Sequence, residues 1–297
     1  MDYLLETRQL TKVYNKRAVV DNVSLHVQKG DIYGLIGRNG AGKTTIMRMV
    51  LSMAFPTEGD IILFGERTNG RSDRRLGSLI EAPGIYRNYT ARGNMEAFCT
   101  LYGVDFSRID SILDYVGLGE TGDKKAGSFS LGMKQRLGIA ITLLDDPEFI
   151  ILDEPVNGLD PAGMKDVRDL ILRLNREKGV TFMISSHLLD ELSKMVNRYG
   201  ILNEGRLVEE ISTEELEMRC RQKLIITVDD LQRAAAIVAT MVPQQDMCFL
   251  NNDIIIASHL EMSAHINKAL IENGIMVSAL QHKTEGTEQY FVQRIGG

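Results

Sequence analysis

The chain has 297 residues and a formal net charge of −6. Hydrophobic residues make up 44% of it and charged residues 25%, which is the composition of a globular protein long enough for one large domain or two smaller ones. The acidic balance argues against general nucleic-acid binding, which would need a basic face.

Cysteine usage and hydropathy favour an intracellular protein. Cys99, Cys220 and Cys248 form no C-x-x-C pair and are expected to be reduced. No apolar run approaches the roughly 18 residues of a membrane span. The N-terminus carries acidic residues where a signal peptide would have a basic start. We therefore expect a cytoplasmic protein, for which any membrane role depends on a partner chain.

The N-terminal part of the chain alternates short strand-like runs with turns. Strands are predicted at residues 4–10, 17–20, 24–27 and 31–36, with a strand pair around 59–65. Residues 45–51 continue as a helix. A buried strand, a glycine-rich loop and a helix therefore follow one another between residues 31 and 51.

That loop, residues 37–44, fits the G-x-x-x-x-G-K-[ST] pattern that wraps nucleotide phosphates. Glycines let backbone N–H groups close around phosphate oxygens, and the dipole of the following helix favours their negative charge. Lys43 would reach the β- and γ-phosphates, and the Thr44 hydroxyl would hold Mg²⁺. The alternative is a plain glycine turn between a strand and a helix. The residues predicted to bind ATP here are Gly37, Arg38, Asn39, Gly40, Ala41, Gly42, Lys43, Thr44 and Thr45.

The middle of the chain is predicted to be helical from about residue 86 to residue 144, with Thr90 as the N-cap of a helix at 91–102. Strands return at residues 149–152, 180–184 and 199–202. Amphipathic helices lie between and after them, with apolar faces formed by Val167, Leu170, Ile171 and Leu174, and by Leu188, Leu192, Met195 and Val196. Strands that alternate with helices indicate an α/β fold with a mostly parallel sheet.

After about Arg219 the pattern starts again. Strands are predicted at residues 224–228, 247–250, 254–257 and 275–280, with two amphipathic helices among them. The order β-α-β-β-α-β predicts a small ferredoxin-like domain. Its histidines, His259, His265 and His282, lack metal-ligand partners at useful spacing and are expected to lie on the surface.

Two acidic residues end the apolar strand at residues 149–152. In an α/β sheet, a carboxylate at the C-terminal end of a strand points into the crevice where ligands bind. Asp153 can orient Mg²⁺, largely through water molecules that the ion keeps. Glu154 can orient and polarise an attacking water molecule. The alternative is a strand that stops at a polar loop.

Further motifs in the same order resemble those of the ATP-binding-cassette (ABC) ATPases. Residues 129–136 read F-S-L-G-M-K-Q-R, where the family carries L-S-G-G-Q followed by Q-R. Residues 157–160, N-G-L-D, resemble its D-loop, and residues 185–187, S-S-H, its switch histidine. Tyr14 resembles the aromatic residue on which adenine stacks. The resemblance extends from residue 1 to about residue 215.

This resemblance implies a P-loop NTPase α/β cassette with an antiparallel β subdomain and an inserted helical subdomain. The cassette would span residues 1–218 with helices at about 86–144, and residues 219–297 would form a small α+β C-terminal domain. By resemblance, two cassettes, identical or related, close head to tail over two ATP molecules. Each nucleotide would lie between the loop of one copy and Ser130 and Gly132 of the other, with Asp160 nearby. Glu154, His187 and Lys43 would be catalytic.

Two departures from the family pattern stand out. Glu81, in L-I-E-A-P-G, occupies the position where most cassettes place a Gln. A carboxylate could hold both Mg²⁺ and nucleotide there, although it loses an amide donor. The signature has Leu131 and Met133 in place of Gly and Gln. Together these segments resemble the bacitracin- and lantibiotic-type branch, whose members work in peptide-antibiotic export and self-immunity.

The predicted function is therefore the ATPase subunit of a transporter with ATP and Mg²⁺ as cofactors. Its partners would be a second cassette and an integral-membrane subunit on a separate chain, so that the protein is peripheral on the inner face of the membrane. No nucleic-acid partner is expected. The alternatives are a soluble cassette ATPase that acts on ribosomes or DNA, and a regulatory module with little turnover. The intact Glu154 argues against the latter.

Overall fold

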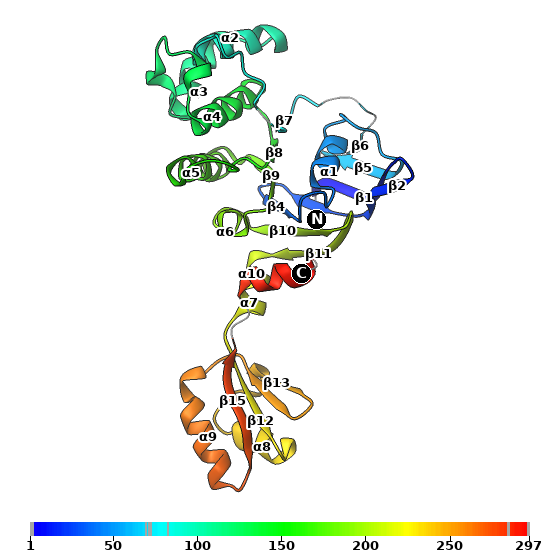
Figure 1. The fold of residues 1–297 in the computed structure, drawn as a ribbon, viewed down its shortest axis with the longest axis vertical. Coiled ribbons are helices and arrows are strands. Elements are labelled where there is room, and N and C mark those ends of the chain that lie inside the picture. The colour runs from blue at the N-terminus through cyan, green and yellow to red at the C-terminus, as the bar shows by residue number, and fades with distance from the viewer. Residues whose placement is uncertain (1–2, 69, 71–72, 82, 284–285, 296–297) are drawn as a thin grey trace. The chain divides into compact units, whose positions relative to one another are not determined.

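The computed structural model describes residues 3–68, 70, 73–81, 83–283 and 286–295 and divides into two compact units (Figure 1). The first comprises the described residues up to Thr213 together with those from Val292 onward, and the second spans Glu214–Phe291. The sequence prediction placed the division after residue 218 and assigned the whole end of the chain to the second domain. The structure instead returns the last residues to the first unit.

A six-stranded sheet forms the centre of the first unit, in the order β11-β10-β4-β9-β8-β7. The pairs from β10 to β7 are parallel, and β11 pairs with β10 in antiparallel fashion. The strands are β4 (Ile32–Ile36), β7 (Leu76–Leu79), β8 (Phe149–Asp153), β9 (Thr181–Ser186), β10 (Arg198–Asn203) and β11 (Arg206–Ser212). Strands β4, β8 and β9 are buried along their whole length, which explains the near-continuous apolar sequences of β4 and β8 and the apolar centre of β9.

A second sheet lies beside the first, and all its strand pairs are antiparallel. Its strands are β1 (Tyr3–Tyr14), β2 (Arg17–Val23), β3 (His26–Gln28), β5 (Glu58–Leu63) and β6 (Glu66–Arg67). Helix α1 (Lys43–Val50) packs between the two sheets, because Ile46, Met47 and Met49 share one buried core with residues of both. This core fixes the position of the loop that precedes α1.

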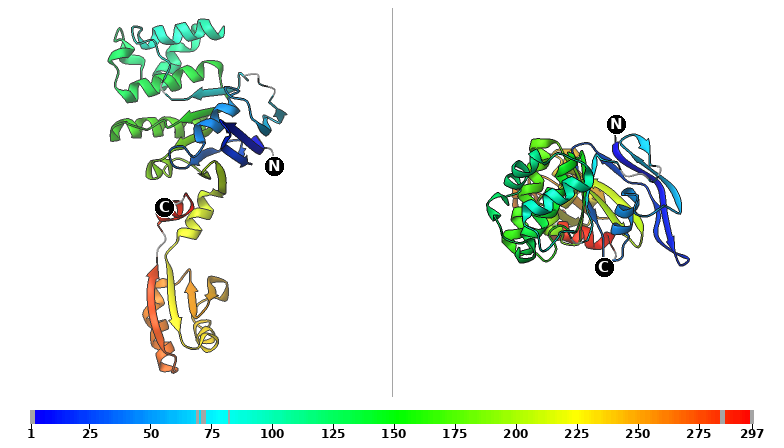
Figure 2. Two further views of the ribbon diagram at one scale, coloured as in Figure 1. Left: turned by 45° about the vertical axis from the view of Figure 1, so that its right-hand side comes forward. Right: turned by 90° about the horizontal axis from the view of Figure 1, so that it is seen from above.

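The remaining helices of the first unit are α2 (Ala91–Tyr102), α3 (Ile109–Tyr115), α4 (Leu131–Thr142), α5 (Pro161–Lys178) and α6 (Leu189–Leu192). Figure 2 shows α2, α3 and α4, in teal and green, gathered at one end of this unit. Thr90 caps α2 as predicted, since its side chain accepts a hydrogen bond of 3.0 Å from the Gly93 N–H. The described helices include none that is long and apolar enough to cross a membrane.

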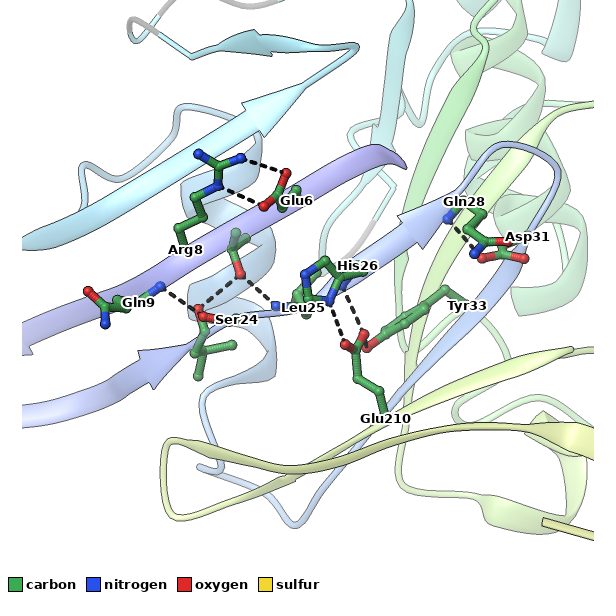
Figure 3. Close-up of polar contacts among 12 residues, drawn as sticks. Glu6, Arg8, Gln9, Ser24, Leu25, His26, Gln28, Asp31, Tyr33 and Glu210 are labelled. Atoms are coloured by element: carbon green, nitrogen blue, oxygen red, sulfur yellow. Dashed lines mark hydrogen bonds and ion pairs between the residues drawn. The ribbon is translucent and has the colours of Figure 1, made fainter. Parts of the chain in front are cut away.

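Glu210 of β11 connects three strands of the first unit (Figure 3). Its Oε1 accepts hydrogen bonds from the His26 N–H at 2.9 Å and from the Tyr33 hydroxyl at 2.8 Å, and its Oε2 lies 2.8 Å from His26 Nδ1. Burial, followed by the neighbouring Glu210 carboxylate, raises the pKa of Tyr33 well above its usual value. The phenol therefore stays a donor, and the carboxylate joins β11 to β3 and β4.

Replacing Glu210 with alanine is expected to lower the free energy of unfolding by about 2–3 kcal/mol, because it leaves buried donors without an acceptor. Glu210→Gln should recover part of this loss, since an amide oxygen can still accept from Tyr33. Urea denaturation of the full chain, followed by circular dichroism, measures the change. The control is Val208→Ala on the same strand, where the side chain is 47% exposed. Equal losses in Glu210→Ala and the control would contradict the assigned role.

The second unit contains one four-stranded antiparallel sheet in the order β13-β14-β12-β15. Its elements are β12 (Lys223–Val228), α8 (Leu231–Val238), β13 (Met247–Leu250), β14 (Asp253–Ile256), α9 (Ser263–Glu272) and β15 (Val277–Lys283). The element order β-α-β-β-α-β, with β12 and β14 in the middle, is that of ferredoxin-like folds. The chain passes between the units within α7 (Thr213–Cys220) and within α10 (Thr287–Arg294).

Candidate functional site

The glycine-rich loop connects the end of β4 to the start of α1, in the strand–loop–helix context that the sequence predicts. Gly42 immediately precedes α1 with φ 103°, a conformation open mainly to glycine. A Cβ at Gly42 would also lie 2.7 Å from the Val19 carbonyl oxygen, and one at Gly37 would lie 2.7 Å from that of Leu202. The loop is therefore closed by neighbouring backbone on two sides, which only glycine permits.

Lys43 lies folded against this loop. Its side chain is 6% exposed, and its Nζ donates to the carbonyl oxygens of Gly37 at 2.6 Å and Arg38 at 3.3 Å. The nearest carboxylate oxygen of Glu154 is 3.8 Å from the same Nζ. Burial lowers the pKa of Lys43, while Glu154 and Asp153 partly offset this effect. The loop thus holds a cation that phosphate oxygens could bind in place of the carbonyls.

Two of the three residues predicted to hold Mg²⁺, Thr44 and Asp153, lie together. Thr44 Oγ1 donates to Asp153 Oδ2 at 2.8 Å, although 109 positions separate them in sequence. The other oxygen, Asp153 Oδ1, accepts from Ser185 Oγ at 2.5 Å, so that β9 fixes the carboxylate. A hydroxyl and a carboxylate are hard oxygen donors of the kind that Mg²⁺ binds. The described residues form no group of three or more His, Cys, Asp or Glu suited to a metal ion.

Glu154 is held by Ser185, which lies in β9, and by His187, which follows that strand. Its N–H donates to Ser185 Oγ at 3.0 Å, and its Oε2 lies 2.8 Å from His187 Nδ1. Its backbone has φ 52°, a left-handed conformation that is uncommon for glutamate and often found at active sites. The geometry therefore orients one carboxylate oxygen toward His187 and the other toward Lys43.

Glu81 is not placed with these residues. It has φ 65°, its side chain is 65% exposed, and its carboxylate forms an ion pair with Arg48 of α1. A role for Glu81 as a ligand of Mg²⁺ or nucleotide remains a prediction. Its neighbour Ala82 lies outside the described residues.

The residues of the signature and the D-loop lie at the N-termini of two neighbouring helices. Ser130 caps α4 by accepting from the Met133 N–H at 3.2 Å, and Asp160 caps α5 by accepting from the Gly163 N–H at 3.2 Å. A Cβ on Gly132 would lie 3.4 Å from the Gly163 Cα, so the helix starts are close together. Both capping residues are exposed.

Tyr14 is 46% exposed, and its ring centre is 4.9 Å from the Lys12 ammonium. The ring is therefore accessible for stacking, as the predicted adenine contact requires. Arg136 donates to the carbonyl oxygens of Val116 and Gly117 at 3.0 and 3.1 Å. Arg136 therefore ties α4 to the residues that follow α3.

One contributor to the site, Ser185, and one residue outside it, Arg48, were missed in the sequence. Ser185, which binds Asp153, was recognised only as part of the S-S-H segment. The register of the sheet could have predicted this contact, because Asp153 and Ser185 are direct partners in the parallel pair β8–β9. Arg48 carried no sequence signal beyond a basic residue in a helix. Its partner became visible only in the fold.

Comparison with known proteins agrees with this geometry. A family profile described as "ABC transporter" matches residues 20–157. The chain is 43% identical over 302 residues to the bacitracin transport ATP-binding protein BcrA of Bacillus licheniformis, covering 100% of this chain and 99% of that protein. It is 44% identical over 207 residues to the lantibiotic transport ATP-binding protein SrtF of Streptococcus pyogenes, covering 70% and 90%.

Among solved structures, the ADP conformation of MJ1267, an ATP-binding cassette of an ABC transporter, matches with a TM-score of 0.66 at 24% identity. The match covers 72% of this chain and 93% of that one. It confirms the predicted cassette fold, with its parallel and antiparallel sheets. The sequence identity of 43% to BcrA over the full length of the chain supports the same assignment. The chain belongs to the ABC transporter family, as an ATP-binding subunit that hydrolyses ATP.

Proposed function

We propose that this ATPase powers export of a peptide antibiotic, in resistance or self-immunity, through a membrane subunit on another chain. The similarity to BcrA supports this proposal, because it covers all of the chain, including the second unit outside the common cassette. The name of SrtF, a lantibiotic transport protein, points to the same class of cargo.

The site geometry supports a division of roles in hydrolysis. Lys43 and the loop N–H groups bind the phosphates, and Glu154 orients and polarises the attacking water, held in place by His187 and Ser185. Thr44 and Asp153 would hold Mg²⁺, which neutralises charge on the phosphate oxygens. The observation that carries this assignment is the 2.8 Å contact between His187 and Glu154 beside the phosphate loop.

The second half of each site would come from another cassette. Ser130 and Gly132 start α4, where free N–H groups and a helix dipole suit an anion. The Ser130 side chain is exposed, so a phosphate on a second chain could approach it. We infer a head-to-tail dimer, with each ATP between one loop and the signature of the partner.

A surface suited to the membrane partner lies close to Glu81. A hollow of about 460 Å³ is lined by residues of β7, α2 and α4, and Phe98, Leu101 and Tyr102 of α2 are among them. Leu101 is 69% exposed and its neighbour Tyr102 is 39% exposed, so the hollow offers adjacent apolar surface to a partner. Binding there would place the cassette on the inner face of the membrane without a span of its own.

Co-expression tests this proposal. The chain should copurify from membranes with a multi-spanning protein encoded beside it, and the pair should raise resistance of a sensitive host to bacitracin or a lantibiotic. Glu154→Gln should abolish the resistance without disrupting the complex. Leu101→Asp should disrupt the complex, whereas Val208→Asp, an exposed change on β11, serves as the control. Resistance that is equal with and without active Glu154 would refute coupling to ATP hydrolysis.

A further inference from the structure

The end of the chain forms part of the wall of a hollow beside the phosphate loop. This hollow has a volume of about 940 Å³, and its lining comprises residues 38–41 of the loop, residues 17–19 of β2, residues 203–205 of the β10–β11 turn, and Ile295. All of these belong to the first unit, because the residues from Val292 onward group with the cassette. None of the motifs of the nucleotide site includes Ile295.

An ion pair fixes the segment that carries Ile295. Helix α10 ends at Arg294, whose Nε lies 2.5 Å from Glu209 Oε2 of β11, and the two side chains are only 27% and 20% exposed. The hairpin that contains Glu209 also contacts the loop, since the Gly205 N–H donates to the Ala41 carbonyl oxygen at 3.2 Å. The C-terminal segment and the phosphate loop therefore both contact the hairpin formed by β10 and β11.

The position of the hollow relative to a bound nucleotide follows from strand register. Tyr14, the candidate for adenine stacking, pairs directly with Arg17 in the β1–β2 ladder, and Arg17 lines the hollow. The loop at its other side holds the phosphates. Ile295 therefore borders the space between the base and the phosphates, where a sugar or base edge would lie.

The volume of the hollow shows whether Ile295 lines it or fills it. Ligand pockets typically measure about 300–1,000 Å³, and the hollow still measures about 940 Å³ with Ile295 in its lining. The side chain thus borders the space without filling it. An isoleucine offers apolar contact and no hydrogen bond, whereas Arg17 and Arg38 supply positive charge nearby.

We propose that Ile295 contacts the bound adenine nucleotide as an apolar wall, and that docking of the C-terminal segment is linked to nucleotide binding. The inference rests on the assignment of ATP to this loop. If the nucleotide contacts the docked segment, it must stabilise docking by the same factor by which docking tightens nucleotide binding. The end of the chain is then a part of the ATP site.

Equilibrium binding of ADP to the full chain tests the contact without turnover. Ile295→Ala should weaken binding about fivefold, because part of the apolar contact is lost. Ile295→Asp should weaken it about tenfold or more, and this larger loss should shrink at high salt, since it places a carboxylate near the phosphates. The control is Val292→Ala in α10, three residues before Ile295, where the residue is 44% exposed. Affinities of both Ile295 variants equal to or above that of the unchanged chain would overturn the contact.

Limited trypsin digestion tests whether nucleotide binding stabilises docking of the C-terminal segment. Saturating ADP should slow cleavage after Arg294 several-fold, measured by mass spectrometry of the full chain. Cleavage after Arg233, an exposed residue of the second unit, should not change and provides an internal control. Equal rates after Arg294 with and without ADP would overturn the linkage. A complete failure of the unchanged chain to bind ADP would instead refute the assignment of nucleotide to the loop.

Discussion

Replacing Glu154 with glutamine is expected to lower ATP turnover 10²–10⁴-fold while ATP binding is retained. A positioned general base contributes about this factor, which corresponds to roughly 3–5 kcal/mol of barrier. Glutamine keeps the shape of the side chain and can keep the contact with His187, but it cannot accept a proton from water. Phosphate release and nucleotide affinity, measured on the same preparation, separate the two effects.

The structure also suggests the matched control. Asp190→Asn makes the same change of charge in the adjacent α6, on an exposed side chain. It should leave turnover within a factor of two of the unchanged chain, as expected for a surface charge. If Glu154→Gln retains more than a tenth of the original turnover, another group activates the water, and the contact between Glu154 and His187 serves structure instead.

Sequence alone could predict the parts of this site whose chemistry is local. The glycine loop, the acidic end of β8 and the histidine after β9 each lie in a short segment with its own pattern. Both faces of β8 and β9 are buried, so each has an apolar run, F-I-I-L in β8 and F-M-I in β9, from which its position could be predicted. Parallel strands then place Asp153 and His187 at the same sheet edge, close to the loop.

The remaining features depend on contacts between distant segments. Strand β7 could not be predicted from its sequence, L-G-S-L, which is short and has no apolar run. It is a strand because it pairs with β8 at the edge of the sheet. The apolar face of Leu188, Leu192, Met195 and Val196 predicted a full helix, but α6 covers only Leu189–Leu192. The last three of those residues are buried nonetheless. The spacing of three and four residues between these apolar side chains therefore predicted their burial correctly and the length of the helix wrongly. Non-helical turns after a short helix can place side chains on one face at the same spacing.

The end of the chain shows the same limit. Helix α10 was not predicted, although Tyr290 and Phe291 within it are 2% and 1% exposed. Two adjacent aromatic residues near a C-terminus could have indicated a buried element. The pairing of Arg294 with Glu209 could not, because 85 positions separate them and neither residue type identifies its partner.

Replacing Lys43 with methionine is expected to weaken ATP binding about 10- to 100-fold without destabilising the nucleotide-free chain. A hydrogen bond to a charged partner contributes about 1.5–3 kcal/mol, which corresponds to this range. Methionine has a similar length and cannot bind phosphate. The affinity for ATP and the urea midpoint of the nucleotide-free protein are the two measurements. Lys165→Met, on the exposed surface of α5, is the control for both.

The stability part of this prediction follows from the cost of burying a cation. Because burial lowers the pKa of Lys43, the folded chain binds its proton less tightly than the unfolded chain does. Stability should therefore rise with pH between the folded and unfolded pKa values of this lysine, and Lys43→Met should lack that rise. An apolar side chain avoids the desolvation cost of the ammonium but leaves the Gly37 carbonyl and Glu154 without their cation, so the two effects oppose each other and the variant should be about as stable as the unchanged chain. A less stable variant that keeps its ATP affinity would show that Lys43 supports the fold. A variant that is as stable as the unchanged chain but binds ATP more weakly would show that Lys43 serves phosphate binding and not the fold.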